Sequence, residues 1–244
     1  MSDPILEVGG AGIESTDAKV KVLMNNMVNS ETPGFRRADA VIQSFPTYLD
    51  AAQNRSTTQI PKVETIRHDQ TPGTLLRTGN KLDVAIGGDG FFVIETPAGR
   101  GYTRDGRFTL DMDGRVVTTA GNHPVVGEGG PISISPGSEI EVTGTGEILV
   151  DGVKEDQLRV VGFKDPSSLD PLSGSTFKAT SRANEKIIDV PRVIQGYVET
   201  SNVNMVDSMM ELVYLSRIYG LNAKIISNRD VMMSRAIEMG RPSQ

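Results

Sequence analysis

The 244-residue chain contains no cysteine and no tryptophan, and it has only two histidines. Without cysteine the chain has no disulfide, no thiolate metal ligand and no cysteine nucleophile. Aromatic residues make up only 5% of the chain and hydrophobic residues 37%. Such a composition supports a small core, so we expect part of the chain to fold only against partners.

Positive charge and long apolar runs are also scarce. The formal net charge is −6, whereas non-specific binding to nucleic acid needs a basic surface that displaces counterions. No apolar stretch approaches the roughly 20 residues needed to span a bilayer. The N-terminal residues show neither the basic region nor the apolar run of a secretory signal peptide, so we expect none.

The C-terminal region has the periodicity of one long helix. Asn204 can cap its start, and residues spaced by four and three positions then form a mainly apolar stripe. About 35 residues at 1.5 Å each predict a helix of roughly 50 Å. Further apolar residues lie outside the stripe, so one partner helix cannot cover them all. The stripe consists of Met205, Met209, Leu212, Ser216, Tyr219, Ala223, Ile226, Asp230, Met233 and Ile237.

A shorter apolar stripe near the N-terminus predicts the partner helix. Its members are Ile13, Val20, Met24 and Met27, and the helix is expected to end within residues 29–34. Three glycines near its start weaken it, because each interior glycine costs about 1 kcal/mol relative to alanine. We therefore do not expect this helix to be stable alone.

The middle of the chain, residues 82–163, favours short antiparallel strands. The runs 83–86 and 91–94 are apolar, and Asp-Gly pairs such as Asp113-Gly114 and Asp151-Gly152 are strong hairpin signals. Several short strands at about ten-residue spacing predict a small barrel or sandwich.

Four segments resemble, in order, signature segments of the flagellar rod and hook proteins. They are residues 25–36, 82–93, 102–108 and 195–204, and together they extend over nearly the whole chain. Within that family, the chain length and the segments 71–73 and 123–132 are most similar to the proximal rod proteins. The segment 197–204 is also close to the distal rod proteins, which are the alternative.

The resemblance implies a structural rod subunit with no enzymatic activity and no cofactor. Such subunits leave the cytoplasm through the flagellar export apparatus without a cleaved signal. In the periplasm they assemble with copies of themselves and neighbouring rod proteins into a hollow helical shaft that passes torque to the hook. Ring proteins around the rod are further expected partners, and neither nucleic acid nor a small-molecule substrate is expected. The residues expected to pack between subunits of the inner tube are Met24, Asn25, Asn26, Met27, Asn29, Phe35, Met205, Met209, Leu212, Tyr219, Ile226, Met233 and Ile237.

The predicted fold class is α+β. Long N- and C-terminal helices would pack as a coiled-coil-like inner domain, and a central antiparallel β-rich domain would form the outer part. The expected divisions are residues 1–35 for the N-terminal helical segment, 36–81 for an extended or loop connection, 82–190 for the β-rich outer domain, and 191–244 for a return strand and the long C-terminal helix.

Two other functions compete with that of a structural subunit. A secreted β-rich binding module is favoured only if the helical ends are dispensable. A hydrolase would need a concave site with acids of perturbed pKa, and the acids of this sequence are scattered. His68 and His123 stand in turn-like contexts, and Asp111-x-Asp113-Gly114 lacks the later ligands of a calcium loop.

Overall fold

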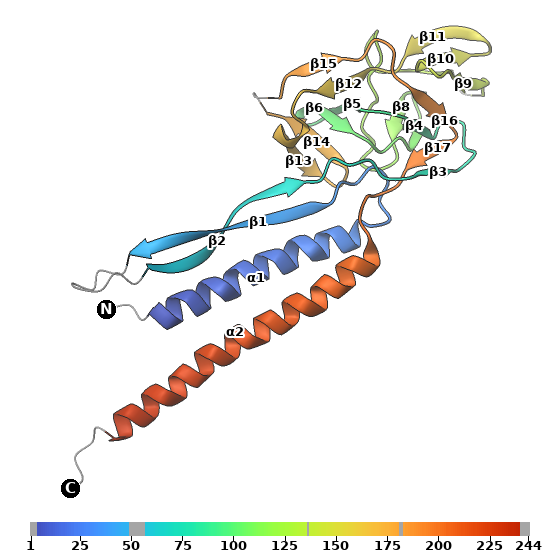
Figure 1. The fold of residues 1–244 in the computed structure, drawn as a ribbon. Helices are drawn as coiled ribbons and strands as arrows, with labels where there is room; N and C mark the ends of the chain where they lie inside the picture. Colours follow the sequence, from blue (N-terminus) through green and yellow to red (C-terminus); the bar gives the residue numbers. More distant parts are fainter. Residues whose placement is uncertain (1–3, 49–56, 136, 181–182, 240–244) are drawn as a thin grey trace. The chain divides into compact units, whose positions relative to one another are not determined.

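A computed structural model describes residues 4–48, 57–135, 137–180 and 183–239 of the chain (Figure 1). The described residues contain two α-helices, α1 (Pro4–Val28) and α2 (Met205–Met239), with β-strands between them. Neither helix combines the length and apolar character needed to cross a membrane. The contacts divide the chain into two compact units, which we call the terminal unit (Met1–Val28, Ala38–His68 and Asn204–Gln244) and the central unit (Asn29–Arg37 and Asp69–Val203).

The terminal unit combines the two helices with a long β-hairpin. Strands β1 (Ala38–Tyr48) and β2 (Thr57–His68) pair antiparallel, with Ala38 opposite His68 at the base of the hairpin. A bulge between Val41 and Ile42 shifts the register. Helix α1 contacts both strands of the hairpin and also α2 (Figure 1).

The prediction of a coiled-coil-like inner domain is wrong. The described part of the terminal unit has only two helices, and α1 contacts the hairpin as well as α2. A coiled coil needs large apolar side chains that enter holes on the facing helix. Helix α1 instead presents Gly9 and Gly12 to α2. The α+β class holds in part, because the rest of the chain forms several antiparallel sheets.

The central unit is built around a six-stranded antiparallel sheet. Its strand order is β13-β14-β6-β5-β12-β15, so β13 and β15 are its edges. A three-stranded sheet has the order β11-β10-β9. Three two-stranded sheets pair β4 with β16, β3 with β17, and β7 with β8. The strands are β3 (Leu75–Arg77), β4 (Val84–Ile86), β5 (Phe91–Thr96), β6 (Gly99–Thr103), β7 (Phe108–Leu110), β8 (Val116–Thr118), β9 (Ile140–Val142), β10 (Glu147–Val150), β11 (Val153–Gln157), β12 (Val160–Phe163), β13 (Leu169–Ser173), β14 (Thr176–Ala179), β15 (Glu185–Ile187), β16 (Val193–Gln195) and β17 (Tyr197–Glu199).

Strand β5 explains why this sheet has two cores. Successive side chains of a strand point to opposite faces. Phe92 and Ile94 therefore enter one apolar cluster, while Phe91 and Val93 enter another. The continuous apolar run that predicted a strand is thus buried on both sides.

The hairpin predicted at Asp151-Gly152 is confirmed. These two residues connect β10 to β11 and have φ values of 52° and 81°. Two positive φ values in a two-residue loop are the requirement of a type I′ turn, whose twist matches that of the paired strands. Asp-Gly meets it because aspartate tolerates this region and glycine prefers it.

Candidate assembly interface

Helix α2 begins at a capped turn. The side-chain oxygen Oδ1 of Asn204 accepts hydrogen bonds from the backbone N–H groups of Val206, at 3.0 Å, and Asp207, at 3.4 Å. This is the geometry of an N-cap, and Asp207 adds negative charge near the positive end of the helix dipole. The predicted cap is therefore confirmed.

Most large apolar side chains of α2 are exposed to solvent. Among the described side chains of this helix, Leu215 is the only apolar one that is buried, with 4% of its surface exposed. Large exposed apolar patches mark interaction sites. The exposed large apolar residues are Val206, Met209, Met210, Val213, Tyr214, Tyr219, Leu221, Ile225, Val231 and Met232.

The buried side of α2 lies close to α1. A Cβ atom placed on Gly9 would lie 3.0 Å from Cγ1 of Ile226, and one on Gly12 would lie 3.1 Å from Nδ2 of Asn222. Both distances are shorter than ordinary van der Waals contact. The glycines that weaken α1 as an isolated helix therefore allow the two helix backbones to approach each other.

Asn26 of α1 binds the base of the hairpin. Its side-chain Nδ2 donates to the carbonyl of Ala38 at 2.7 Å, and its Oδ1 accepts from the N–H of Ala38 at 2.8 Å. Asn26 is only 1% exposed. Its amide thus satisfies both backbone groups of one strand residue, as a neighbouring strand would.

The residues predicted to pack between subunits lie in different environments, and their packing between subunits stays a prediction. The exposed ones are Met24, Asn25, Met209 and Tyr219. The half-buried ones are Met27, Asn29, Met205, Leu212 and Ile226. The buried ones are Asn26 and Phe35. The side chains of Met233 and Ile237 lie outside the described residues.

A buried carboxylate in the central unit joins segments that are far apart in the sequence. Glu199 is 1% exposed and forms ion pairs with the guanidinium groups of Arg36 and Arg104. Its Oε1 accepts a hydrogen bond from the backbone N–H of Gly73 at 3.0 Å. Its backbone carbonyl accepts another from the N–H of Gly34 at 2.8 Å. Four segments therefore meet at this one residue.

The surroundings of the Glu199 cluster are tightly fitted. Gly34 has a φ of 69°, and a Cβ atom there would collide with the backbone of Arg104 and Asp105. Burial lowers the pKa of the Arg104 guanidinium, and the carboxylate of Glu199 opposes this shift. The same guanidinium lies 5.3 Å from the ring centre of Phe91, within the range of a cation–π interaction.

Sequence reasoning did not identify Glu199 as the centre of a buried cluster. A signal was nevertheless present, because three of the four signature segments each supply one member. Arg36 ends the segment 25–36, Arg104 lies in 102–108 and Glu199 lies in 195–204. Charged residues that recur in separate signature segments are therefore candidates for a tertiary ion-pair cluster.

Two family models match the chain in the regions just described. Residues 85–150 match the flagellar hook protein FlgE/F/G D1 domain, and residues 194–239 match the flagellar basal body rod FlgEFG protein C-terminal region. The chain is also 31% identical to the flagellar basal-body rod protein FlgG of Buchnera aphidicola, over 97% of this chain and 99% of that protein. The chain belongs to the flagellar basal-body rod protein family.

Rod proteins of two kinds are similar to this one. The flagellar basal-body rod protein FlgF of Rhizobium meliloti is 32% identical over 91% of each chain. FlgF of Salmonella typhimurium is 30% identical over 98% of each chain. Family membership makes this chain a structural rod subunit and confirms the resemblance found in its four segments.

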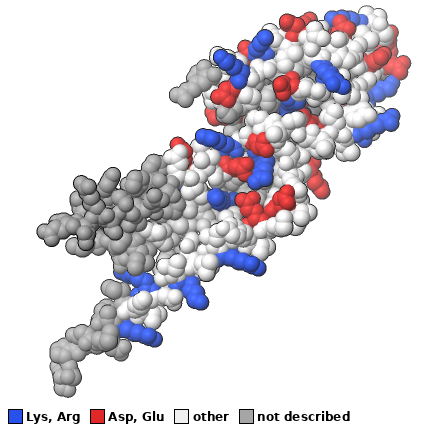
Figure 2. All heavy atoms as spheres, viewed as in Figure 1, with Lys and Arg blue, Asp and Glu red and all other residues white. Residues whose placement is uncertain are grey.

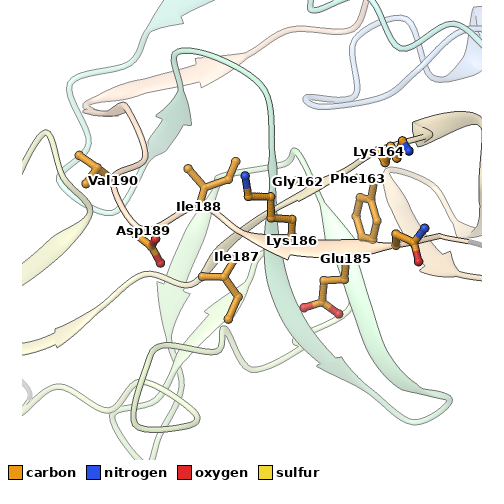
Figure 3. Close-up of a pocket in the computed structure, with 10 residues that line it drawn as sticks. Gly162, Phe163, Lys164, Glu185, Lys186, Ile187, Ile188, Asp189 and Val190 are labelled. Atoms are coloured by element: carbon orange, nitrogen blue, oxygen red, sulfur yellow. The ribbon is translucent and has the colours of Figure 1, made fainter.

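A second exposed surface of this rod protein is a groove beside β15 (Figure 3). It has a volume of about 720 Å³ and is lined by residues 162–164 and 184–190. The hydroxyl of Tyr102 donates a hydrogen bond to Glu185 of β15 at 2.9 Å. Burial, together with that carboxylate, raises the pKa of Tyr102 to about 12. The strand is short and carries charged side chains, which limits pairing with a further strand.

The acids of the calcium-like motif stabilise a turn of the rod protein. Oδ2 of Asp111 and Oδ2 of Asp113 lie 2.8 Å and 2.9 Å from the guanidinium nitrogens of Arg115. Oδ1 of Asp111 also accepts backbone hydrogen bonds from Asp113 and Arg115. Among the residues that the structure describes, no group of three or more histidines and acids could hold a metal ion.

Proposed function

We propose that this rod protein polymerises into a hollow helical shaft that transmits torque from the motor to the hook. The observation that carries the proposal is the exposed apolar surface of α2, which a single chain leaves in water. Burying apolar surface contributes about 25 cal/mol per Å². Heterologous contacts between copies can bury it without closing the assembly, which suits a helical polymer.

The proximal part of the rod is the favoured position. The segments 71–73 and 123–132 resemble proximal rod proteins, and the two FlgF relatives are matched along at least 91% of both chains. The distal part is the second candidate. It is favoured by the match to FlgG of Buchnera aphidicola along 97% of this chain.

The proposed partners are copies of this chain, the neighbouring rod proteins and, around the finished rod, ring proteins. The proposed route is export through the flagellar apparatus in an unfolded state, followed by folding and assembly in the periplasm. A helix that exposes apolar side chains over much of its length supports this order, because ordering it on docking avoids premature association. The chain acts in this scheme as a mechanical part and not as an enzyme.

Deleting residues 205–244 tests the proposal in the native bacterium. We expect loss of swimming and basal bodies that stop before the hook, seen by electron microscopy, because α2 supplies the surface that joins subunits. Re-expression of the full chain is the control and restores both. Normal swimming with complete hooks would overturn the proposal and favour the β-rich binding module.

A single label distinguishes the two positions along the rod. The chain has no cysteine, so Met112→Cys creates one reactive thiol at a fully exposed side chain of the central unit. Gold bound to this thiol in purified basal bodies is expected near the inner end of the rod. Gold near the hook end would instead assign the chain to the distal rod.

A further inference from the structure

The charges of α2 are separated along its length. Its first turns contain two acidic residues, Asp207 and Glu211, which we call the acidic start. Residues 212–229 contain three basic residues, Arg217, Lys224 and Arg229, and no acidic one, and we call this stretch the basic segment. The helix dipole favours acids near the start, but it acts only over the last turn and does not account for cations in the middle of the helix.

Three of these charged groups face solvent and have no ion-pair partner among the residues that the structure describes. Asp207, Arg217 and Lys224 are exposed and form no ion pair with any described residue. Figure 2 shows one face of the molecule. On that face, the part of α2 beyond its first turns carries basic side chains (blue) and no acidic ones (red). The charged groups alternate with the exposed apolar side chains along the helix. One surface therefore carries both apolar area and two patches of opposite charge.

We propose that α2 docks along α2 of a second copy, parallel to it and shifted, so that the acidic start of one copy lies beside the basic segment of the next. The proposal rests on the rod function proposed above. Placing Asp207 beside Lys224 requires a shift of 17 positions (224 minus 207), which is about 26 Å along a helix. The occupant is a second copy because this one helix carries both halves of the complementary pair.

The shift explains why such a contact extends instead of closing. In a parallel pair, each copy leaves one acidic start and one basic segment for the next neighbours, which is a heterologous contact. An antiparallel pair would satisfy both patches within a dimer and stop there. Apolar burial supplies the affinity in this arrangement, while the charges set direction and register.

Charge exchange tests the pairing in the native bacterium. Asp207→Lys alone and Lys224→Asp alone each place like charges together, so we expect about tenfold fewer complete hook–basal bodies. The double variant restores the opposite charges and is expected to restore the count. Lysine at position 207 also opposes the helix dipole, so rescue by the second change separates pairing from helix stability. Glu155→Lys, an equal change at an exposed residue of the central unit, is the matched control and is expected to assemble normally.

Cysteine pairing tests the direction in purified, full-length chains under assembly conditions. Asp207→Cys combined with Lys224→Cys places thiols at the two exposed positions that the proposal brings face to face. Oxidation is expected to give a ladder of linked chains, and each single variant is expected to give at most dimers. Dimers alone from the double variant would overturn the parallel arrangement in favour of the antiparallel one.

The outcomes separate this inference from the rod function. If the single charge variants assemble normally while deletion of residues 205–244 stops the rod, the charge pairing is wrong and the rod function stands. If the double variant stays defective although its helix content by circular dichroism equals that of the natural chain, the pairing is also wrong. If the deletion itself leaves rods intact, both proposals fail.

Discussion

The two units of this chain use apolar side chains in opposite ways. In the central unit, Phe92, Val93 and Ile94 of one strand have no exposed surface. In the terminal unit, Leu23, Ala38 and Leu215 are the buried apolar residues among those described, and α2 exposes most of its large apolar side chains. The difference indicates that the central unit is stabilised by its own core, whereas α2 leaves apolar surface for the subunit contacts proposed above.

The largest effect on the free energy of unfolding is expected when one aromatic side chain in the core of the central unit is truncated. Phe92→Ala removes a fully buried side chain that packs edge-on against Phe108, with 5.2 Å between ring centres. Loss of this packing is expected to lower the free energy of unfolding by about 3–5 kcal/mol. Urea unfolding of the purified chain measures it.

Met210→Ala is the matched change in the terminal unit. This side chain is 61% exposed, so we expect the free energy of unfolding to change by less than about 0.5 kcal/mol. Assembly into rods is expected to weaken all the same. A loss of stability as large as that of Phe92→Ala would contradict the contrast between the units.

Removing the charge of Glu199 is expected to be almost as damaging to the central unit. Glu199→Gln leaves Arg36 and Arg104 buried without their shared carboxylate. Breaking a buried ion pair on one side costs about 3 kcal/mol or more. Glu155→Gln removes a charge at an exposed position and serves as the control in the same urea measurement. Equal stability of the two variants would mean that the cluster contributes little.

A smaller effect is expected from Asn26→Ala in the terminal unit. The change leaves the N–H and carbonyl of Ala38 without their side-chain partner. Unsatisfied buried groups cost about 1–3 kcal/mol. We expect faster hydrogen exchange of the Ala38 amide, measured by NMR, and unchanged exchange in β5. Unchanged exchange at Ala38 would show that this bond does not hold the hairpin.

The smallest effect compares two neighbouring glycines of α1. Gly10→Ala meets no atom within 4 Å and replaces a poor helix former, so it is expected to stabilise the helix by about 1 kcal/mol. Gly9→Ala brings a Cβ to 3.0 Å from Ile226 and is expected to lose that gain. Thermal unfolding followed by circular dichroism compares the two variants.

Local patterns predicted the parts of the fold that local chemistry determines. The cap at Asn204 and the 4-3 spacing predicted α2, and Asp151-Gly152 predicted the hairpin between β10 and β11. The hairpin of β1 and β2 was not predicted. Its strands contain Pro46 and Pro61 and lack regular alternation of apolar and polar residues, both of which argue against strands.

The sequence did not predict the tertiary contacts, because the residues that form them are far apart in the chain. Asn26 and Ala38 are 12 positions apart, and Arg104 and Glu199 are 95 positions apart, with no periodicity that connects them. The helix pattern identified an apolar face but not what covers it, which is why the coiled-coil expectation failed. The roles of these paired residues can be recognised only once the fold has brought them together.

Opening of the Glu199 cluster can be followed by limited proteolysis with trypsin. Arg36 and Arg37 are adjacent basic residues, the side chain of Arg36 is 1% exposed, and the N–H of Arg37 donates to Oδ1 of Asn202 at 2.7 Å. Trypsin therefore cannot take this segment into its cleft while the cluster is closed. The cleavage rate after residue 36 then reports how often this corner of the central unit opens, and it measures the local rigidity that the proposed torque-transmitting shaft requires.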